Sequence, residues 1–458
     1  MFVTVSARLH RDATGACTEF PALLTPAGVV EPLVEYCFHH YENRSQAWMK
    51  EVISSARLFL QYVQANPAEP DPCRLFVNFA QRLYGGTFDL RTKLDPSGLY
   101  WAPHSPQSAR KVIIHLSNFF AWLGGVRPAA AQVNPSYAGD SFDRQIREAA
   151  YQYRRNAAFL GHTWEKKGRP ERNGGYYVAP QLEPKVAKTE PPAFPDARFQ
   201  ELLFKGFLAG PRPDYRGALI TLLLHGAGFR ESEPFQLYIA DVFPHPFNRK
   251  QAGVVIHHPS KGTAPGDWLD PRGRELQGNR EAYLAQEFGL LPRTKMTGQR
   301  HAGWKGGLHD QAYFKAAYWF DPVYGEWFLE YWDHYLDQVM CVERDHPFAF
   351  INLHREPVGA MYTLAQYNKA HAAACERIGL PVSKALGTTS HGHRHAYSER
   401  LKRAGLDEKI IQRCRHDISI ESQGVYTQPY THEMVEDLKA AAQRLHDKYR
   451  ITQSEINE

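Results

Sequence analysis

The chain has 458 residues, of which 43% are hydrophobic, and its 54 basic and 49 acidic residues leave a formal net charge of +5. This length and apolar content predict two or three hydrophobic cores in a multidomain protein. No apolar run approaches the roughly 20 residues that a membrane-spanning helix needs, and the first residues lack the apolar core of a signal peptide. We therefore expect a cytoplasmic protein without a membrane partner. The six cysteines include no Cys-x-x-Cys pair, which argues against a zinc ribbon or a disulfide framework and favours reduced, mostly buried thiols.

Three amphipathic segments follow an N-terminal stretch, 1–36, that we assign as an extension. Apolar residues recur at helical spacing in each segment, and each segment is bounded by Pro, Gly or Ser. The stripes run over Trp48–Val63, Leu75–Leu83 and Val112–Leu123. They predict a small helical bundle, which we place in a domain covering 37–165.

A basic segment and a linker separate this bundle from the rest of the chain. Eight arginines and lysines lie between Arg144 and Arg172, which fits a surface that follows phosphates and equally fits a solvated helix face with a basic tether. The stretch 166–195 is rich in Gly, Pro and Lys and cannot bury enough apolar surface to fold alone. It is therefore predicted to be a linker, after which Asp196 is expected to cap a new helix.

The first chemical motif follows a buried helix predicted over Leu219–Leu224. Two glycines and then Arg230 and Glu233 come directly after this helix. An arginine held by a buried helix offers a planar donor fork that fits the oxygens of a phosphate and stays charged at any working pH. We expect Arg230 to bind a phosphate and Glu233 to orient it. The glycines lack the third glycine of a dinucleotide-binding loop.

The second motif lies near the C-terminus. His391 and Arg394 are three residues apart, so at the start of a helix they project from one face and can share an anion. A Gly-Leu-Asp turn at 405–407 predicts a helix stop and restart. A second helix is expected to end near His416, and ten positions later Tyr426 could serve as a covalent nucleophile.

Taken in order, Arg230 with Glu233, the HGHRH run, His416 and Tyr426 resemble the tyrosine recombinase (phage integrase) family. The resemblance implies a mostly α fold with a small antiparallel β-sheet, in which a helical N-terminal core-binding domain precedes an α+β catalytic domain at 196–458. Two departures are visible. The spacing from His416 to Tyr426 is one residue longer than expected, and His393 replaces a usually apolar residue. Tyr430, in a literal Tyr-Thr-His, is an alternative nucleophile.

Family members also carry a lysine on a β-hairpin between the two arginine motifs. Lys261 follows a strand-like run, and Lys305 lies in a Gly-rich loop before an aromatic, alternating segment. We prefer Lys305, because the family places this lysine just ahead of such a strand. Between the candidates lies an insertion at about 262–303 that an ordinary hairpin lacks. This arrangement resembles integrases of small mobile cassettes of the gamma-mobile-trio type.

The resemblance implies a site-specific recombinase that acts on double-stranded DNA through a 3′-phosphotyrosyl intermediate and needs no cofactor. It implies that Arg230 and Arg394 bind the phosphate, that Lys305 protonates the leaving oxygen, that His391 handles the tyrosine proton and that His416 donates to a phosphate oxygen. It also implies a tetramer on two DNA sites, other cassette-encoded proteins as possible partners and a place on the bacterial nucleoid.

Two other functions remain open from the sequence. The same residues suit a type IB topoisomerase-like nicking enzyme, or a decayed DNA-binding accessory of another recombinase. The alternating histidines at 391, 393 and 395 have no carboxylate or cysteine partner at ligand spacing, so we predict no metal site. A final amphipathic helix, capped by Thr431, is expected to pack on its own domain or on a neighbouring subunit.

Overall fold

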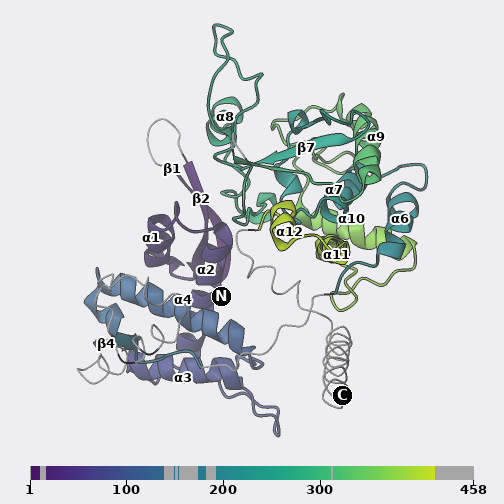
Figure 1. The fold of residues 1–458 in the computed structure, drawn as a ribbon. Helices are drawn as coiled ribbons and strands as arrows, with labels where there is room; N and C mark the ends of the chain where they lie inside the picture. The colour runs from purple at the N-terminus through teal and green to yellow at the C-terminus, as the bar shows by residue number, and fades with distance from the viewer. Residues whose placement is uncertain are drawn as a thin grey trace, which may run out of the picture. The chain divides into compact units, whose positions relative to one another are not determined.

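The computed structural model describes residues 2–10, 17–138, 149, 153, 174–181, 192–310 and 313–417 (Figure 1). Two compact units emerge, one formed by Met1–Lys185 with Lys295–Gly298 and the other by Val186–Thr294 with Gln299–Glu458. Tyr426, Tyr430, the eight basic residues from Arg144 to Arg172, the C-terminal helix and most of the linker lie outside the described residues.

The first unit begins with an antiparallel sheet that the sequence analysis did not predict. Strand β1 (Val3–His10) pairs with β2 (Cys17–Thr25), and β2 pairs with the short β3 (Gly28–Val29). Helix α1 (Glu31–His39) follows. Phe20 and Leu23 of β2 are buried in the core of the unit. The segment expected as an extension therefore contributes to a folded core.

Three helices of this unit confirm the three apolar stripes. They are α2 (Gln46–Ala65), α3 (Pro72–Gly85) and α4 (Pro106–Gly124). Ser105 caps α4 by accepting from the backbone N–H of Ser108 at 3.3 Å, as expected from its position before a proline. The aromatic rings of Phe59, Phe79 and Phe120 pack edge to face at the centre of the bundle. A short 3-10 turn, η1 (Pro128–Gln132), precedes β4 (Ser136–Ala138), which pairs with β5 (Gly174–Tyr176).

The second unit is built around α7 (Tyr215–Gly226), which is buried along most of its length. It packs against α9 (Pro322–Val339) and α11 (Ser390–Arg403). Three short turns precede it: η3 (Asp196–Arg198), α6 (Phe199–Glu201) and the π-helical η4 (Leu202–Phe207). The expectation that Asp196 caps a helix is wrong, because its carboxylate pairs with the guanidinium of Arg400 instead.

A small antiparallel sheet lies at one side of α7, after the 3-10 turns η5 (Pro234–Gln236) and η6 (Ile239–Asp241). Its strand order is β6 (Val242–Pro244), β7 (Ala252–His257) and β8 (Phe314–Ala316), and its register places Ile256 opposite Lys315. The predicted insertion separates β7 from β8 and contains α8 (Arg280–Phe288) and the turn η7 (Gly298–Arg300). Figure 1 shows α8 displaced from the sheet along this excursion. These elements confirm a mostly helical fold with small antiparallel sheets.

The last described elements carry the second chemical motif. They are α10 (Leu364–Arg377), α11 and α12 (Glu408–Cys414). Gly405 adopts the left-handed conformation with φ of 70°, and Asp407 caps α12 by accepting from the N–H of Lys409 at 2.8 Å. The predicted stop and restart between these helices is therefore confirmed.

The sequence also led to expectations about membrane-spanning helices and about the cysteines. No helix within the described ranges is long and apolar enough to cross a membrane. The six cysteines are all free, but only Cys37 and Cys375 are buried and Cys341 is exposed. The prediction of mostly buried thiols is therefore wrong, although the absence of pairing among them agrees with their scattered positions.

Candidate active site

A turn that contains Gly228 follows α7 and leads directly to Arg230. The same turn also contacts Arg394. Gly228 has φ of 69°, a left-handed conformation that side chains other than glycine rarely adopt. A Cβ atom there would collide with the ring of Tyr397. The carbonyl oxygen of Gly228 accepts a hydrogen bond from Nη1 of Arg394. The two glycines noted in the sequence thus form a tight turn between a buried helix and the first arginine.

Glu233 holds Arg230 in two places. Its Oε2 accepts from the backbone N–H of Arg230 at 2.8 Å, and its Oε1 accepts from Nη1 of the same arginine at 3.2 Å. Glu233 is 1% exposed, whereas the Arg230 side chain is 15% exposed. The structure therefore brings this pair together in the manner expected of an oriented arginine.

The lysine that joins this pair is Lys315, which the sequence analysis did not select. Its Nζ donates to Oε1 of Glu233 at 2.6 Å and lies 4.2 Å from the centroid of the Trp304 ring. Its side chain is fully buried. Both candidates from the sequence, Lys305 and Lys261, are exposed and are not brought into the cluster. The sequence could have indicated Lys315, because this lysine lies inside the alternating aromatic segment and not ahead of it.

Arg230 and Arg394 converge on one carboxylate oxygen. Nη2 of Arg230 and Nη2 of Arg394 donate to Oδ1 of Asp417 at 2.7 and 3.1 Å. Nη2 of Arg394 also donates to the carbonyl oxygen of Arg415 at 3.0 Å, and Nη2 of Arg415 lies 3.1 Å from Oδ2 of Asp417. Three guanidiniums therefore surround one buried anion. No sequence motif predicted Asp417, because Arg230 and Arg394 reach it from distant segments of the chain.

The charges of this cluster perturb one another strongly. Burial alone would raise the pKa of Glu233, but the nearby charges of Lys315, Arg230 and Arg394 lower it to about 2. Burial lowers the pKa of Lys315 against the opposing attraction of Glu233. Burial and the positive charge of Arg230 lower the pKa of Arg394 to about 10. The cluster is therefore a desolvated group of cations that favours an oxyanion.

His416 lies beside the cluster but is engaged with the sheet. Its φ of 55° places it in a tight turn after α12, and its Nε2–H donates to the carbonyl oxygen of Ala316 at 2.9 Å. Burial lowers its pKa to about 4, so the ring is neutral near pH 7 and Nε2 carries its only proton. In this arrangement His416 cannot also donate to a phosphate. It fixes the strand that carries Lys315.

His391 is at the exposed start of α11, and its ring lies edge to face against that of His395 with centroids 4.6 Å apart. The structure thus brings Arg230, Glu233 and Arg394 into one cluster, with His416 at its edge. His391 shares the helix of Arg394 without contacting the anion. Tyr426, the predicted nucleophile, lies outside the described residues.

A glycine-rich loop crosses the cluster. A Cβ atom added to Gly307 would lie 3.1 Å from Nζ of Lys315 and 3.3 Å from Nη1 of Arg230. The backbone N–H of Leu308 donates to the carbonyl oxygen of His416 at 3.1 Å. Lys305 was expected to act in this Gly-rich run. The run instead brings the backbone of Gly307 close to Lys315 and Arg230, where a side chain would not fit without displacing them.

The third residue of the HGHRH run, His393, belongs to a buried chain of imidazoles. Its Nδ1 lies 3.1 Å from Nδ1 of His225, and its Nε2 lies 2.8 Å from Nε2 of His371. Nη1 of Arg400 lies 2.8 Å from Nε2 of His225, and Nδ1 of His371 lies 3.8 Å from Sγ of Cys375. Because arginine only donates, a consistent direction runs from Arg400 through three neutral rings to the thiol.

This chain gives His393 a structural position that the sequence did not reveal. Burial lowers the pKa of His371 to about 4 and those of His225 and His393 well below their usual value. The chain joins α7, α10 and α11, the helix that carries Arg394. Within the described part of the chain, no group of three or more His, Cys, Asp or Glu residues is placed to hold a metal ion.

No protein-family model and no curated protein matches the chain. Its fold is similar to that of several solved structures at low identity. For the XerH site-specific recombinase bound to difH substrate, identity is 14%, coverage is 89% of this chain and 83% of that chain, and the TM-score is 0.45. For the XerA recombinase, identity is 13%, coverage is 90% of this chain and 96% of that chain, and the TM-score is 0.34. For a lambda integrase dimer bound to a COC′ core site, identity is 10%, coverage is 87% of this chain and 78% of that chain, and the TM-score is 0.40.

Proposed function

We propose that this protein is a tyrosine-type site-specific DNA recombinase, the integrase of a mobile element. The observation that carries the proposal is the convergence of Arg230 and Arg394 on one oxygen of Asp417. A carboxylate oxygen has the charge and the acceptor geometry of a non-bridging phosphate oxygen, and planar guanidinium forks suit both. In this proposal the scissile phosphate of double-stranded DNA takes the place of the Asp417 carboxylate between the two arginines.

In the proposed reaction, the phenolic oxygen of Tyr426 attacks the phosphorus and the bond from phosphorus to the 5′ oxygen breaks. The products are a 3′-phosphotyrosyl link and a free 5′-hydroxyl. A 5′-hydroxyl of the partner strand then attacks the link and releases the tyrosine. One ester replaces another, so ATP is not consumed. Arg230 and Arg394 stabilise the charge that develops on the phosphoryl oxygens.

Proton transfer in this proposal is assigned to Lys315 rather than Lys305. A lysine with a lowered pKa releases a proton to the leaving 5′ oxygen more readily than a solvated lysine. Lys315 is buried beside Glu233, within the same cluster as Arg230. His391, on the exposed start of α11, accepts the proton of the attacking tyrosine. Because His416 already donates to Ala316, we assign it to holding β8 in place.

Covalent trapping on a nicked suicide substrate tests the nucleophile. The wild-type chain should form a protein–DNA adduct that resists denaturation and persists in a chelator. Tyr426→Phe should bind the DNA and form no adduct, and Tyr430→Phe should form it normally. Loss of the adduct only in Tyr430→Phe would move the nucleophile, and loss in neither variant would end the proposal.

The products distinguish recombination from related chemistry. A recombinase should give exchanged DNA junctions on two-site substrates and assemble as a tetramer on them, which light scattering of the complex can measure. Relaxation of supercoils without exchanged junctions would instead indicate a type IB topoisomerase-like enzyme. DNA binding without any adduct would indicate an accessory protein. Sequencing the junctions in cells that carry the flanking element would identify the target.

A further inference from the structure

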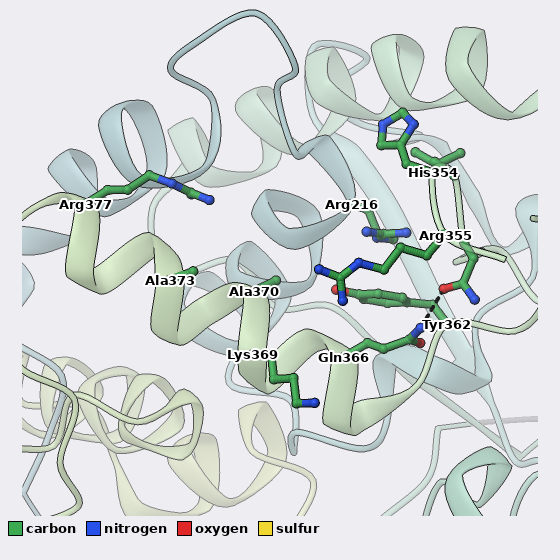
Figure 2. Close-up of a pocket in the computed structure, with 11 residues that line it drawn as sticks. Arg216, His354, Arg355, Tyr362, Gln366, Lys369, Ala370, Ala373 and Arg377 are labelled. Carbon is green, nitrogen blue, oxygen red and sulfur yellow. Dashed lines mark hydrogen bonds between the residues drawn. The ribbon is translucent and has the colours of Figure 1, made fainter.

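A cavity of about 300 Å³ opens beside α10, on the second unit (Figure 2). Residues of α10, the N-terminal end of α7 and the segment before α10 form its walls. Its lining includes five basic side chains and no acidic one: Arg216, His354, Arg355, Lys369 and Arg377. A cavity of this size and charge is a candidate binding site.

Helix geometry separates this cavity from the candidate active site. Gln366, Lys369, Ala373 and Arg377 share one face of α10, whereas Asn368 projects about 145° away from the centre of that face. Asn368 is linked through Ser390 to Glu231, the neighbour of Arg230. Arg216 is at the start of α7, and a helix of 12 residues spans about 18 Å before the turn that leads to Arg230.

Polar and stacking contacts hold the side chains at the floor of the cavity. The guanidinium of Arg216 lies over the ring of Tyr362, with Cζ 3.7 Å from its centroid, and donates to the carbonyl oxygen of Ile351. Gln366 donates to Oδ1 of Asn352 at 2.9 Å, the bond dashed in Figure 2. The same Gln366 side chain completes the N-terminal capping box of α10. The polar groups are therefore preorganised, which lowers the entropic cost of binding.

The rim carries charge that the protein does not neutralise. Arg355 and Lys369 are exposed, and neither has an ion-pair or hydrogen-bond partner within the described ranges. Arg216 has one weak acidic neighbour, Asp214, at 3.7 Å, and Arg377 donates to the carbonyl oxygen of Gly206. Four permanent cations therefore line one cavity, and among the described residues only Asp214 forms an ion pair with any of them. Like charges that line one cavity repel one another, and a bound anion would reduce this repulsion.

We infer that this cavity is a phosphate-binding site, separate from the candidate active site. A carboxylate brings one charge and two acceptor oxygens, whereas a terminal phosphate brings nearly two charges and three acceptor oxygens near pH 7. The larger charge matches the excess of cations, and the guanidinium forks of Arg216 and Arg355 match the phosphate oxygens. The terminal phosphate can belong to a small phosphorylated compound or to a 5′-phosphorylated DNA end. The inference does not depend on the proposed recombinase activity.

Calorimetric titration of the full chain with inorganic pyrophosphate at low ionic strength tests the site. The double variant Arg355→Ala/Lys369→Ala should weaken binding at least tenfold. The control Arg249→Ala/Lys250→Ala removes the same two residue types from an exposed turn outside the cavity and should leave binding unchanged. Arg230→Ala should retain this binding, which separates it from any phosphate held by the candidate active site. Circular dichroism would show that the double variant folds.

The outcomes divide cleanly. If binding is undetectable in the wild type, or is equal in the double variant and the control, the inference is overturned. Equal binding of glutamate and pyrophosphate would overturn the choice of phosphate over carboxylate. Tighter binding of a 5′-phosphorylated oligonucleotide than of its 5′-hydroxyl form, lost in the double variant, would assign the site to a DNA end. Pyrophosphate binding without that difference would assign it to a small compound.

Discussion

Replacing Asp417 by asparagine should shift stability and phosphate affinity in opposite directions. Asp417 is 3% exposed and accepts from Arg230 and Arg394 at 2.7 and 3.1 Å. Removing one partner of a buried ion pair leaves uncompensated charge and costs about 3–5 kcal/mol. We therefore expect Asp417→Asn to lower the free energy of unfolding by about 3 kcal/mol, measured by urea denaturation at pH 7.

The same change should favour DNA. The phosphate must displace Asp417, and a displaced carboxylate about 5 Å from the phosphate would repel it by about 3 kcal/mol at an effective dielectric constant of about 20. Solvent and rearrangement reduce this figure, so we expect the dissociation constant for uncleaved DNA to fall about tenfold, which corresponds to about 1.4 kcal/mol. Equilibrium binding in a Tyr426→Phe background measures this effect without cleavage.

Glu233→Gln provides a matched control. It also removes a buried carboxylate from Arg230, but Glu233 contacts Lys315 rather than Arg394. It should weaken both folding and DNA binding. If Asp417→Asn likewise weakens DNA binding, Asp417 positions the arginines and does not occupy the phosphate site. That result would refute the reasoning, even if the covalent adduct still formed.

Two further predictions concern the lysine and the histidine chain. Lys315→Met should reduce the rate of adduct formation at least a hundredfold, whereas Lys305→Ala should change it less than threefold. Single-turnover assays measure both rates, and the reverse ranking would return the role of proton donor to Lys305. His371 has a pKa of about 4 when folded, below its unfolded value of about 6.5, so its stabilising contribution is present above pH 6.5 and is lost as pH falls towards 4. His393→Leu should reduce stability by about 2 kcal/mol at pH 7, because one ring nitrogen of His225 and one of His371 lose their partner. Urea denaturation at pH 7 and pH 5 should show a smaller loss on acidification than in the wild type; an unchanged or larger loss would contradict a coupled, neutral chain.

Local patterns predicted the helices of the first unit well. The stripes of α2, α3 and α4 depend on side chains three and four residues apart, and their bounds depend on neighbouring Ser, Pro and Gly. Strand β1 was missed although apolar residues alternate at positions 3, 5, 7 and 9. A strand of this kind acquires its stability from pairing with β2, which a local pattern does not include.

The same distinction explains which site residues could be predicted. Arg230 and Arg394 each lie in a short motif with its own helix and turn. Lys315 reaches Glu233 only through the register of β7 with β8, strands that a long insertion separates. Asp417 was not predicted, because only Arg415 of its three arginine partners is near it in the sequence. Non-local pairing and convergence of charge are the two properties that the motifs could not convey.

The hold on Arg394 has an evolutionary consequence. Among the described residues, two of its acceptors are the peptide oxygens of Gly228 and Arg415, and the third is the side chain of Asp417. A peptide oxygen survives any replacement of its own side chain that leaves the backbone path intact. A replacement of Arg415 would therefore keep the peptide acceptor of Arg394, although it would remove the guanidinium that lies 3.1 Å from Oδ2 of Asp417. Position 228 is restricted by its backbone conformation. The path of the main chain therefore determines most of the orientation of the Arg394 guanidinium.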